Sequence, residues 1–102
     1  MTDQSRAAAL DLIQRQIREL DAIYKQASED LNTVAGNERV EKWKKRTVPL
    51  LAQFVGQKEA QQFSNIHPGP SFTNDLLEEL GDDIEVYRSF LVKLSEQLKK
   101  SG

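Results

Sequence analysis

Residues 10–34, "LDLIQRQIRELDAIYKQASEDLNTV", decide the fold of this chain. Their apolar residues are separated alternately by three and four positions: Leu10, Ile13, Ile17, Leu20, Tyr24, Ala27, Leu31 and Val34. This spacing is the a/d seam of a helix that packs along its length against another helix. It predicts a helix over residues 4–33, roughly 45 Å long at 1.5 Å per residue.

The C-terminal segment carries a second seam with the same spacing. Its members are Leu77, Leu80, Ile84, Tyr87, Leu91, Leu94 and Leu98. The spacing keeps its phase through Gly81, so we expect one continuous or slightly bent helix over residues 74–99. The two seams should pack together.

The middle of the chain predicts a helix that starts at Asn37, a good N-cap residue, and stops at Gly56. One face of this helix is apolar and comprises Val40, Trp43, Thr47, Leu50, Leu51 and Phe54. Pro49 cannot donate a helical hydrogen bond and clashes with the carbonyl group of Lys45. The helix should therefore kink at Pro49 or restart there.

A short helix over residues 57–65 should follow, with Ala60 and Phe63 facing inward. The segment "IHPGPSF", residues 66–72, must be a non-helical crossover because of its two prolines and glycine. The prediction is an all-α antiparallel bundle of three to four helices, two of them long and the middle one broken, in one domain over residues 1–102. The expected core residues are Ile17, Leu20, Tyr24, Trp43, Leu50, Phe54, Ile84, Tyr87 and Leu91.

The composition bounds the function classes. With 14 Lys and Arg against 16 Asp and Glu, the net charge of −2 predicts no strong general attraction to polyanions such as nucleic acid. Cysteine is absent, which fits a reducing compartment. No apolar stretch is long enough for a membrane span or a signal peptide, so we expect a cytoplasmic protein without membrane contact.

The run "KWKKR", residues 42–46, offers the one candidate ligand contact. Arg39, Lys42 and Arg46 form a basic stripe at i, i+3 and i+7 beside the apolar face. Such residues commonly lay their methylene groups over the edge of a core, but they could also bind phosphate, nucleic acid or an acidic protein. Trp43 falls on the apolar face, where it cannot stack on a base.

Nothing in the sequence favours an enzyme. The single histidine, His67, lies in a Pro/Gly segment without a second candidate base or ligand nearby. The carboxylate pairs Glu78/Glu79 and Asp82/Asp83 are sequence neighbours, about 100° apart on a helix, and do not converge as an acid/base dyad does. We expect no catalytic residue, no metal site and no cofactor.

Both seams are flanked by further apolar residues, which widen each stripe. These are Leu12 and Ile23 beside the first seam and Val86 and Phe90 beside the second. Each long helix can therefore contact more than one neighbour, either the middle helices or a second copy of the chain.

The middle segment also resembles a known kind of domain. The spaced residues of "WKKRTVPLLAQFVGQKEAQQF", with Trp43, Gly56 and Phe63, and the later run "DIEVYRSFLVKLSEQL" are similar to a helical segment that precedes TIR-like or other effector domains in bacterial predicted nucleotide-binding and anti-phage defence proteins. The resemblance covers residues 38–98, and Pro49 departs from it. It implies a non-catalytic accessory or oligomerisation module, either part of a longer protein or a separate partner.

The leading hypothesis is therefore a helical protein-interaction module that self-associates, as a homo-oligomer, or docks a protein partner. The alternative is a small regulatory protein that binds nucleic acid or a nucleotide through Arg39, Lys42 and Arg46.

Overall fold

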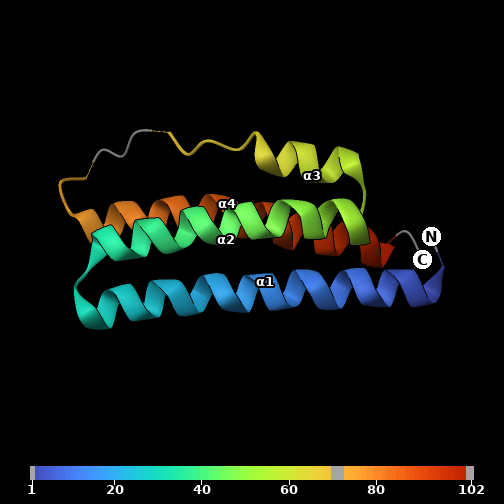
Figure 1. Cartoon of the computed structure of the whole chain (residues 1–102), viewed down its shortest axis with the longest axis horizontal. Coiled ribbons are helices and arrows are strands. Elements are labelled where there is room, and N and C mark those ends of the chain that lie inside the picture. The colour runs from blue at the N-terminus through green and yellow to red at the C-terminus, as the bar shows by residue number, and fades with distance from the viewer. Residues whose placement is uncertain (1, 70–72, 101–102) are drawn as a thin grey trace.

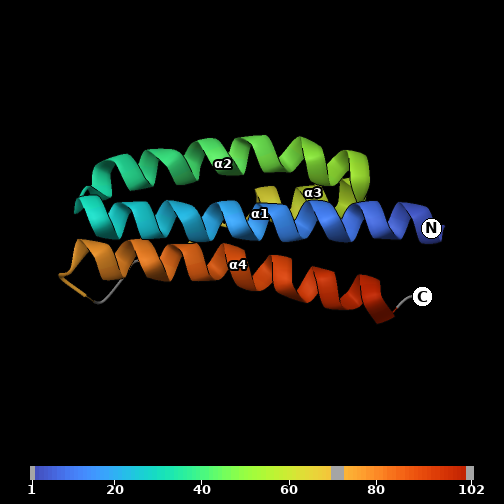
Figure 2. The same ribbon diagram turned by 90° about the horizontal axis from the view of Figure 1, so that it is seen from below.

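The chain is all-α, as the sequence predicts. In the computed structural model, which describes residues 2–69 and 73–100, the helices are α1 (Asp3–Asp30), α2 (Thr33–Phe54), α3 (Gln57–Ser64) and α4 (Leu76–Lys100), and these residues contain no strand. The helices form a bundle 45 Å long (Figure 1). Figure 2 shows α1 running lengthwise between α2 and α4, against which it packs, and α3 packs on α2.

The first seam ends earlier than the spacing predicts. Thr2 caps α1, since its hydroxyl accepts a hydrogen bond from the backbone N–H of Ser5, and the helix stops after Asp30. Leu31 adopts a left-handed conformation with φ of 52°, which turns the chain out of the helix. The prediction that Leu31 and Val34 belong to the seam is wrong, because these side chains are 82% and 69% exposed.

The second helix starts at Thr33 and not after Asn37, so the predicted N-cap is wrong. Asn32 is the cap, and its side-chain oxygen accepts from the N–H of Ala35 at 3.0 Å. Gly36 lies inside the helix and is buried. A Cβ atom on Gly36 would lie 2.8 Å from Cδ2 of Leu80 and 3.0 Å from Cβ of Ala27, so this glycine lets three helices approach closely.

Pro49 does not divide α2, so the restart that we offered as one of two alternatives is wrong. The helix continues through it to Phe54 with Pro49 exposed, and Figure 2 shows that α2 bends gently. The break in the middle of the chain comes instead at Val55 and Gly56, between α2 and α3.

The buried face of α2 also shifts by one residue near its end. It proceeds in steps of four residues from Trp43 to Thr47 and Leu51, all fully buried. Leu50 and Phe54, which we predicted in the core, lie beside this line and are only partly buried.

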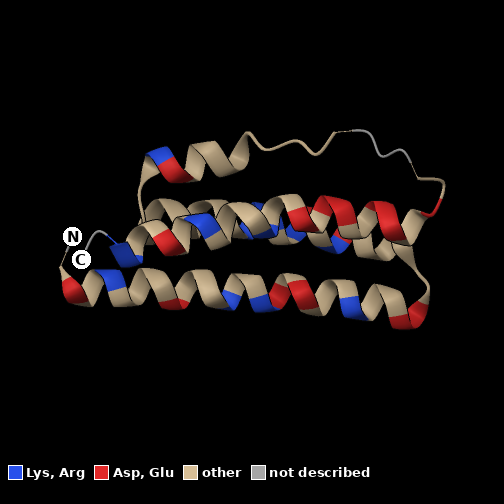
Figure 3. Cartoon of the chain, turned by 180° about the vertical axis from the view of Figure 1, so that it is seen from behind, with Lys and Arg blue, Asp and Glu red and all other residues tan. Residues whose placement is uncertain are grey.

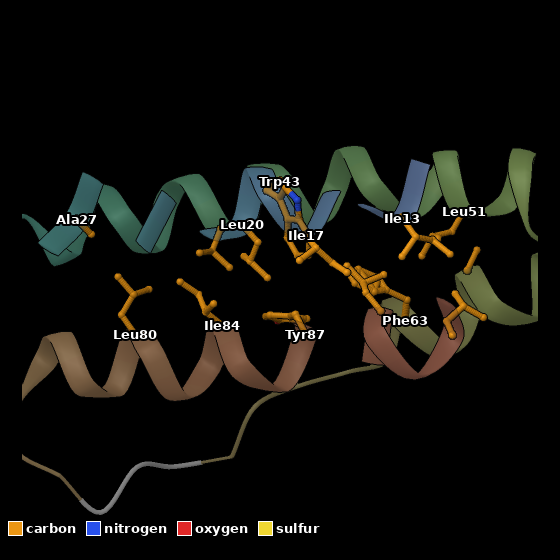
Figure 4. Packing of buried hydrophobic residues seen from close by; sticks show 14 residues of the cluster. Ile13, Ile17, Leu20, Ala27, Trp43, Leu51, Phe63, Leu80, Ile84 and Tyr87 are labelled. Carbon is orange, nitrogen blue, oxygen red and sulfur yellow. The ribbon is translucent and has the colours of Figure 1, made fainter. Parts of the chain in front are cut away.

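The core runs along the bundle between α1, α2 and α4 (Figure 4). The predicted core residues that lie buried in it are Ile17, Leu20, Trp43, Ile84, Tyr87 and Leu91. Tyr24 is partly buried and packs against it. Trp43, Phe63 and Tyr87 meet edge to face, with ring centroids 5.6 to 5.9 Å apart, an arrangement that adds stability beyond the area it buries.

The segment between α2 and α4 follows the prediction where it is described. Ala60 and Phe63 of α3 are buried, and residues 66–69 have no regular structure. Pro70 to Phe72, the rest of the predicted crossover, lie outside the described residues. Asp75 then caps α4, its carboxylate accepting from the N–H groups of Leu77 and Glu78, and α4 continues through Gly81 as predicted.

Candidate interaction surface

The tryptophan of the run KWKKR is a core residue. The indole N–H of Trp43 donates to the backbone oxygen of Gln16 at 3.1 Å, and its side chain has no exposed surface. The neighbouring Thr47 hydroxyl lies 2.7 Å from the carbonyl oxygen of Trp43 and 3.1 Å from the side-chain oxygen of Gln16. Trp43 therefore joins α2 to α1 and offers no surface for stacking.

Lys44 has a structural role that the sequence did not indicate. Its ammonium group donates to the backbone oxygen of Ile66 at 2.6 Å and lies 5.2 Å from the centroid of the Tyr87 ring. The hydrogen bond fastens the start of the crossover to α2, and the ring contact adds a cation–π attraction to α4.

The predicted basic stripe is divided among different environments. Arg46 forms an ion pair with Glu19 of α1, with 3.8 Å between Nη2 and the carboxylate oxygen. Arg39 is partly buried, and its Nη1 atom is enclosed without a hydrogen-bond partner. Lys42 is exposed and is neither enclosed like Arg39 nor paired like Arg46. Of the three cations only Arg39 lies against the fold, as a residue that covers a core edge does.

Residues 2–69 and 73–100 contain no group of three or more His, Cys, Asp or Glu side chains placed to hold a metal ion. His67 is exposed in the segment after α3. None of the helices in this part of the chain has both the length and the apolar character that crossing a membrane requires.

A groove of about 630 Å³ lies between α1 and α4. Its lining residues are Asp21, Tyr24, Glu78, Gly81, Asp82, Ile84, Glu85 and Arg88. We call it the acidic groove, because four carboxylates line it against one guanidinium. Arg88 is already engaged with Asp21, with 3.3 Å between Nε and the carboxylate oxygen.

Gly81 helps to shape the floor of the acidic groove. A Cβ atom at this position would lie 3.1 Å from Cε2 of Tyr24, so the tyrosine ring rests against the bare backbone of α4. From the sequence we expected only that the helix continues, or bends slightly, at Gly81. Its role is to bring Tyr24 and α4 together.

The first half of α4 is strongly acidic, as Figure 3 shows. It carries Glu78, Glu79, Asp82, Asp83 and Glu85 and no basic residue before Arg88. Glu78 and Glu79 lie in the first turn, where the helix dipole favours them, but the other three lie beyond it.

The field of these carboxylates affects groups on and beside α4. Burial raises the pKa of Asp83, and the neighbouring Glu79 and Asp82 raise it further. Burial also raises the pKa of the Tyr87 phenol, with added contributions from Glu41 and Asp83. Burial is the larger cause of both shifts, and the neighbouring carboxylates add to it.

Three aliphatic side chains are exposed at the end of the bundle where α1 turns into α2 and α4 begins (Figure 1). These residues, which we call the apolar end, are Leu31, Val34 and Leu76, with exposures of 82%, 69% and 62%. Figure 4 shows Ala27 and Leu80 facing each other at this end of the core, with Leu31 four residues after the first and Leu76 four before the second. The apolar end thus lies one helical turn beyond the last buried layer.

The conformation of Leu31 is costly for folding. The left-handed conformation disfavours residues with a Cβ by about 1–2 kcal/mol, and glycine or asparagine is usual at this position of a helix end. Burial of the leucine side chain does not offset this cost, because the side chain is largely exposed. The sequence pattern missed this site because the spacing of Leu31 and Val34 continues that of the buried residues.

Comparisons with protein-family models, with curated proteins and with solved structures find no match for this chain. The resemblance of residues 38–98 to helical segments beside effector domains therefore stays a prediction.

Proposed function

We propose that this domain is a non-catalytic protein-interaction module whose docking surface is the apolar end. The observation that carries the proposal is Leu31, a large aliphatic residue in a conformation that costs folding energy and with a side chain that folding leaves exposed. A strained residue retained in this way is typical of functional sites. Val34 and Leu76 are also exposed at this end of the bundle.

Most of the apolar residues beside the two seams are buried within a single chain, which favours a partner other than a second copy. Leu12 is buried, and Ile23 and Phe90 pack against the core within one chain. Of the four residues that widen the seams, only Val86 remains exposed, at 43%. The middle helices therefore account for most of the surface that suggested a homo-oligomer.

An accessory role in a bacterial defence or signalling system, which the sequence resemblance implies, is compatible with such a module. Such a role requires the domain to bind a partner but not to catalyse a reaction. The proposal itself rests on the surface and does not depend on that role.

The direct test is selection from a phage-displayed library of helical peptides against the immobilised domain. A triple variant with Leu31→Asn, Val34→Thr and Leu76→Gln serves for counter-selection, and Val86→Thr is the matched control for loss of an exposed apolar side chain elsewhere. We expect enriched peptides that bind the wild type and the control but not the triple variant. Failure to enrich any sequence, or equal binding to the triple variant, would refute the proposal.

Two further measurements separate the other functions. Light scattering over a micromolar concentration series should show a monomer, whereas a dimer that the triple variant abolishes would point to self-association at the same surface. Titration with short DNA and RNA at two salt concentrations tests binding through Arg39, Lys42 and Arg46. Salt-sensitive binding that is lost with Lys42→Ala would establish the nucleic-acid alternative.

A further inference from the structure

Helices α1 and α3 lie on opposite sides of the layer that α2 and α4 form (Figure 1, Figure 2). On one side, α1 follows this layer over 28 residues. On the other side, the part of the chain that the structure describes has α3 as its one helix, whose eight residues span about 12 Å of a bundle 45 Å long. The chain itself therefore fills the place of a fourth helix only in part.

Two buried side chains, Ala60 and Phe63, dock α3 on the bundle. The ring of Phe63 lies among three aromatic residues, with its centroid 5.6 Å from that of Trp43 and 5.7 Å from those of Tyr87 and Phe90. We call these three residues the aromatic site. An isolated helix shorter than about 12 residues is marginal in water, and no side chain of the described residues caps the N-terminus of α3. The folding of α3 therefore depends on its contact with the aromatic site.

Short non-helical segments flank α3. Val55 and Gly56 separate it from α2, and residues 66–69 after it have no regular structure. On the C-terminal side, the ammonium group of Lys44 donates to the backbone oxygen of Ile66 at 2.6 Å. This oxygen follows Phe63 by three residues, so Lys44 binds the backbone just beyond the end of the docked helix.

The other three helices contact one another without α3. Helix α1 packs against both α2 and α4. Gly36 of α2 lies close to Ala27 of α1 and Leu80 of α4, and Ile13 and Leu20 of α1 are fully buried in the same core. An element that few buried side chains hold opens at a lower free energy than the whole fold. Helix α3 can therefore leave the bundle while the rest stays packed.

We infer that α3 detaches as a unit and that the aromatic site, once uncovered, binds a short helix of another protein with the α3 pattern. This pattern is a small residue followed three positions later by phenylalanine, with the helix ending within one further turn. Helix α3 itself shows what the site accepts, and the backbone at the end of the partner helix would take the place of Ile66 at Lys44. In the unbound domain, α3 competes with the partner and lowers its apparent affinity.

Native-state hydrogen exchange tests the detachment in the wild-type chain. The amides of Ala60 and Asn65 donate to the carbonyl oxygens of Gly56 and Gln61 and report on α3. We expect them to exchange through an opening that low concentrations of urea hardly affect, because little surface is exposed. The amide of Leu20 in α1 should exchange only with global unfolding. If Ala60 and Asn65 also exchange only with global unfolding, the inference is overturned.

A synthetic peptide of residues 56–67 tests the site when added to the variant Phe63→Ala, whose own α3 lacks its anchor. The indole N–H resonance of Trp43, the one tryptophan of the chain, should shift on titration. The same peptide with alanine in place of its phenylalanine is the control and should cause no shift. The variant should bind at least about tenfold more tightly than the wild type, in which α3 competes. Equal affinities, no shift at millimolar peptide, or loss of α1, α2 and α4 in the variant would each overturn the inference.

Two lysine variants, made in the Phe63→Ala background, test the position of the bound peptide. Lys44→Ala should weaken binding about tenfold, since a charge-assisted hydrogen bond is lost. Lys45→Ala, which removes the exposed neighbouring charge, should have little effect. Equal losses would mean general charge attraction and would overturn the assignment.

The aromatic site and the apolar end can fail independently. Helix α3 lies toward the opposite end of the bundle from the turn between α1 and α2 (Figure 1). The triple variant of the apolar end, combined with Phe63→Ala, should therefore bind the peptide as tightly as Phe63→Ala alone. If the triple variant abolishes binding, the peptide occupies the apolar end, which refutes the inference about α3 but not the proposed docking surface.

Discussion

The centre of the bundle and its turn end use similar residues to opposite effect. At the centre, Trp43 and Phe63 have no exposed surface, and the indole N–H finds an acceptor on the facing helix. At the turn end, Leu31 continues the same apolar spacing but is exposed and strained. Spacing alone therefore does not decide which aliphatic residues enter the core. The point at which the helix ends decides it.

The largest expected effect is at the centre. Trp43→Ala should lower the free energy of unfolding by about 3–5 kcal/mol, the usual cost of removing a large buried aromatic side chain. Urea denaturation followed by circular dichroism measures it. Leu31→Ala is the matched change at the turn end and should alter stability very little. Similar losses at both positions would remove the distinction between the two regions.

Removing a polar contact at the centre should lower the free energy of unfolding by a smaller amount. Thr47→Val keeps the shape of the side chain but deprives the buried amide of Gln16 of its hydroxyl partner. Leaving a buried polar group unsatisfied costs about 1–3 kcal/mol. The double variant with Gln16→Met should recover part of this loss, since both partners are then apolar. If the double variant loses as much free energy of unfolding as the two single variants together, Thr47 and Gln16 do not stabilise each other.

The difference between the two regions explains which parts of the fold could be predicted from the sequence. The alternating three and four spacing predicts α1 and α4, and the core positions Ile17, Leu20, Ile84 and Leu91 follow from it. The predicted helix start at Asn37 left Gly36 outside α2, but Gly36 lies inside the helix, at a close contact among three helices. The sequence does not distinguish a glycine that ends a helix from one that lets helices approach closely. Only the packing of the folded chain does.

The candidate site was predictable only in part. The concentration of acids between Glu78 and Glu85 is visible in the sequence, but the groove requires Asp21 and Tyr24 from the other end of the chain. Exposure of Leu31 depends on the early end of α1, which the Asn32 cap of the next helix determines. Helix boundaries are the part of a pattern that sequence defines least well.

A substitution at the turn end should stabilise the domain, whereas those at the centre destabilise it. Leu31→Asn should raise the free energy of unfolding by up to about 1 kcal/mol, because asparagine tolerates the left-handed conformation that costs other residues about 1–2 kcal/mol. The matched control is Val34→Asn, another largely exposed position but inside a helix, which should gain no stability. A loss of stability with Leu31→Asn would mean that the leucine contributes to folding, and the main support for the docking surface would disappear.

The smallest expected effect concerns the acidic half of α4. The raised pKa of Asp83 means that its ionised form is disfavoured in the folded chain, so stability falls as pH rises from the ordinary value of 3.8 through the raised pKa. Asp83→Asn removes the like-charge contact with Glu79 at i, i+4 and should stabilise the domain by about 0.2–0.5 kcal/mol at neutral pH. Thermal denaturation at several pH values measures the difference.

The pH dependence distinguishes charge repulsion from a general benefit of asparagine at this position. In acid below pH 3.8, Asp83 is protonated in both states, and the advantage of Asp83→Asn should vanish. Asp11→Asn is the matched control, since it breaks the exposed pair with Arg15 and should slightly destabilise the domain at neutral pH. An advantage of Asp83→Asn that persists in acid would show that it does not come from charge repulsion between Asp83 and its neighbouring carboxylates.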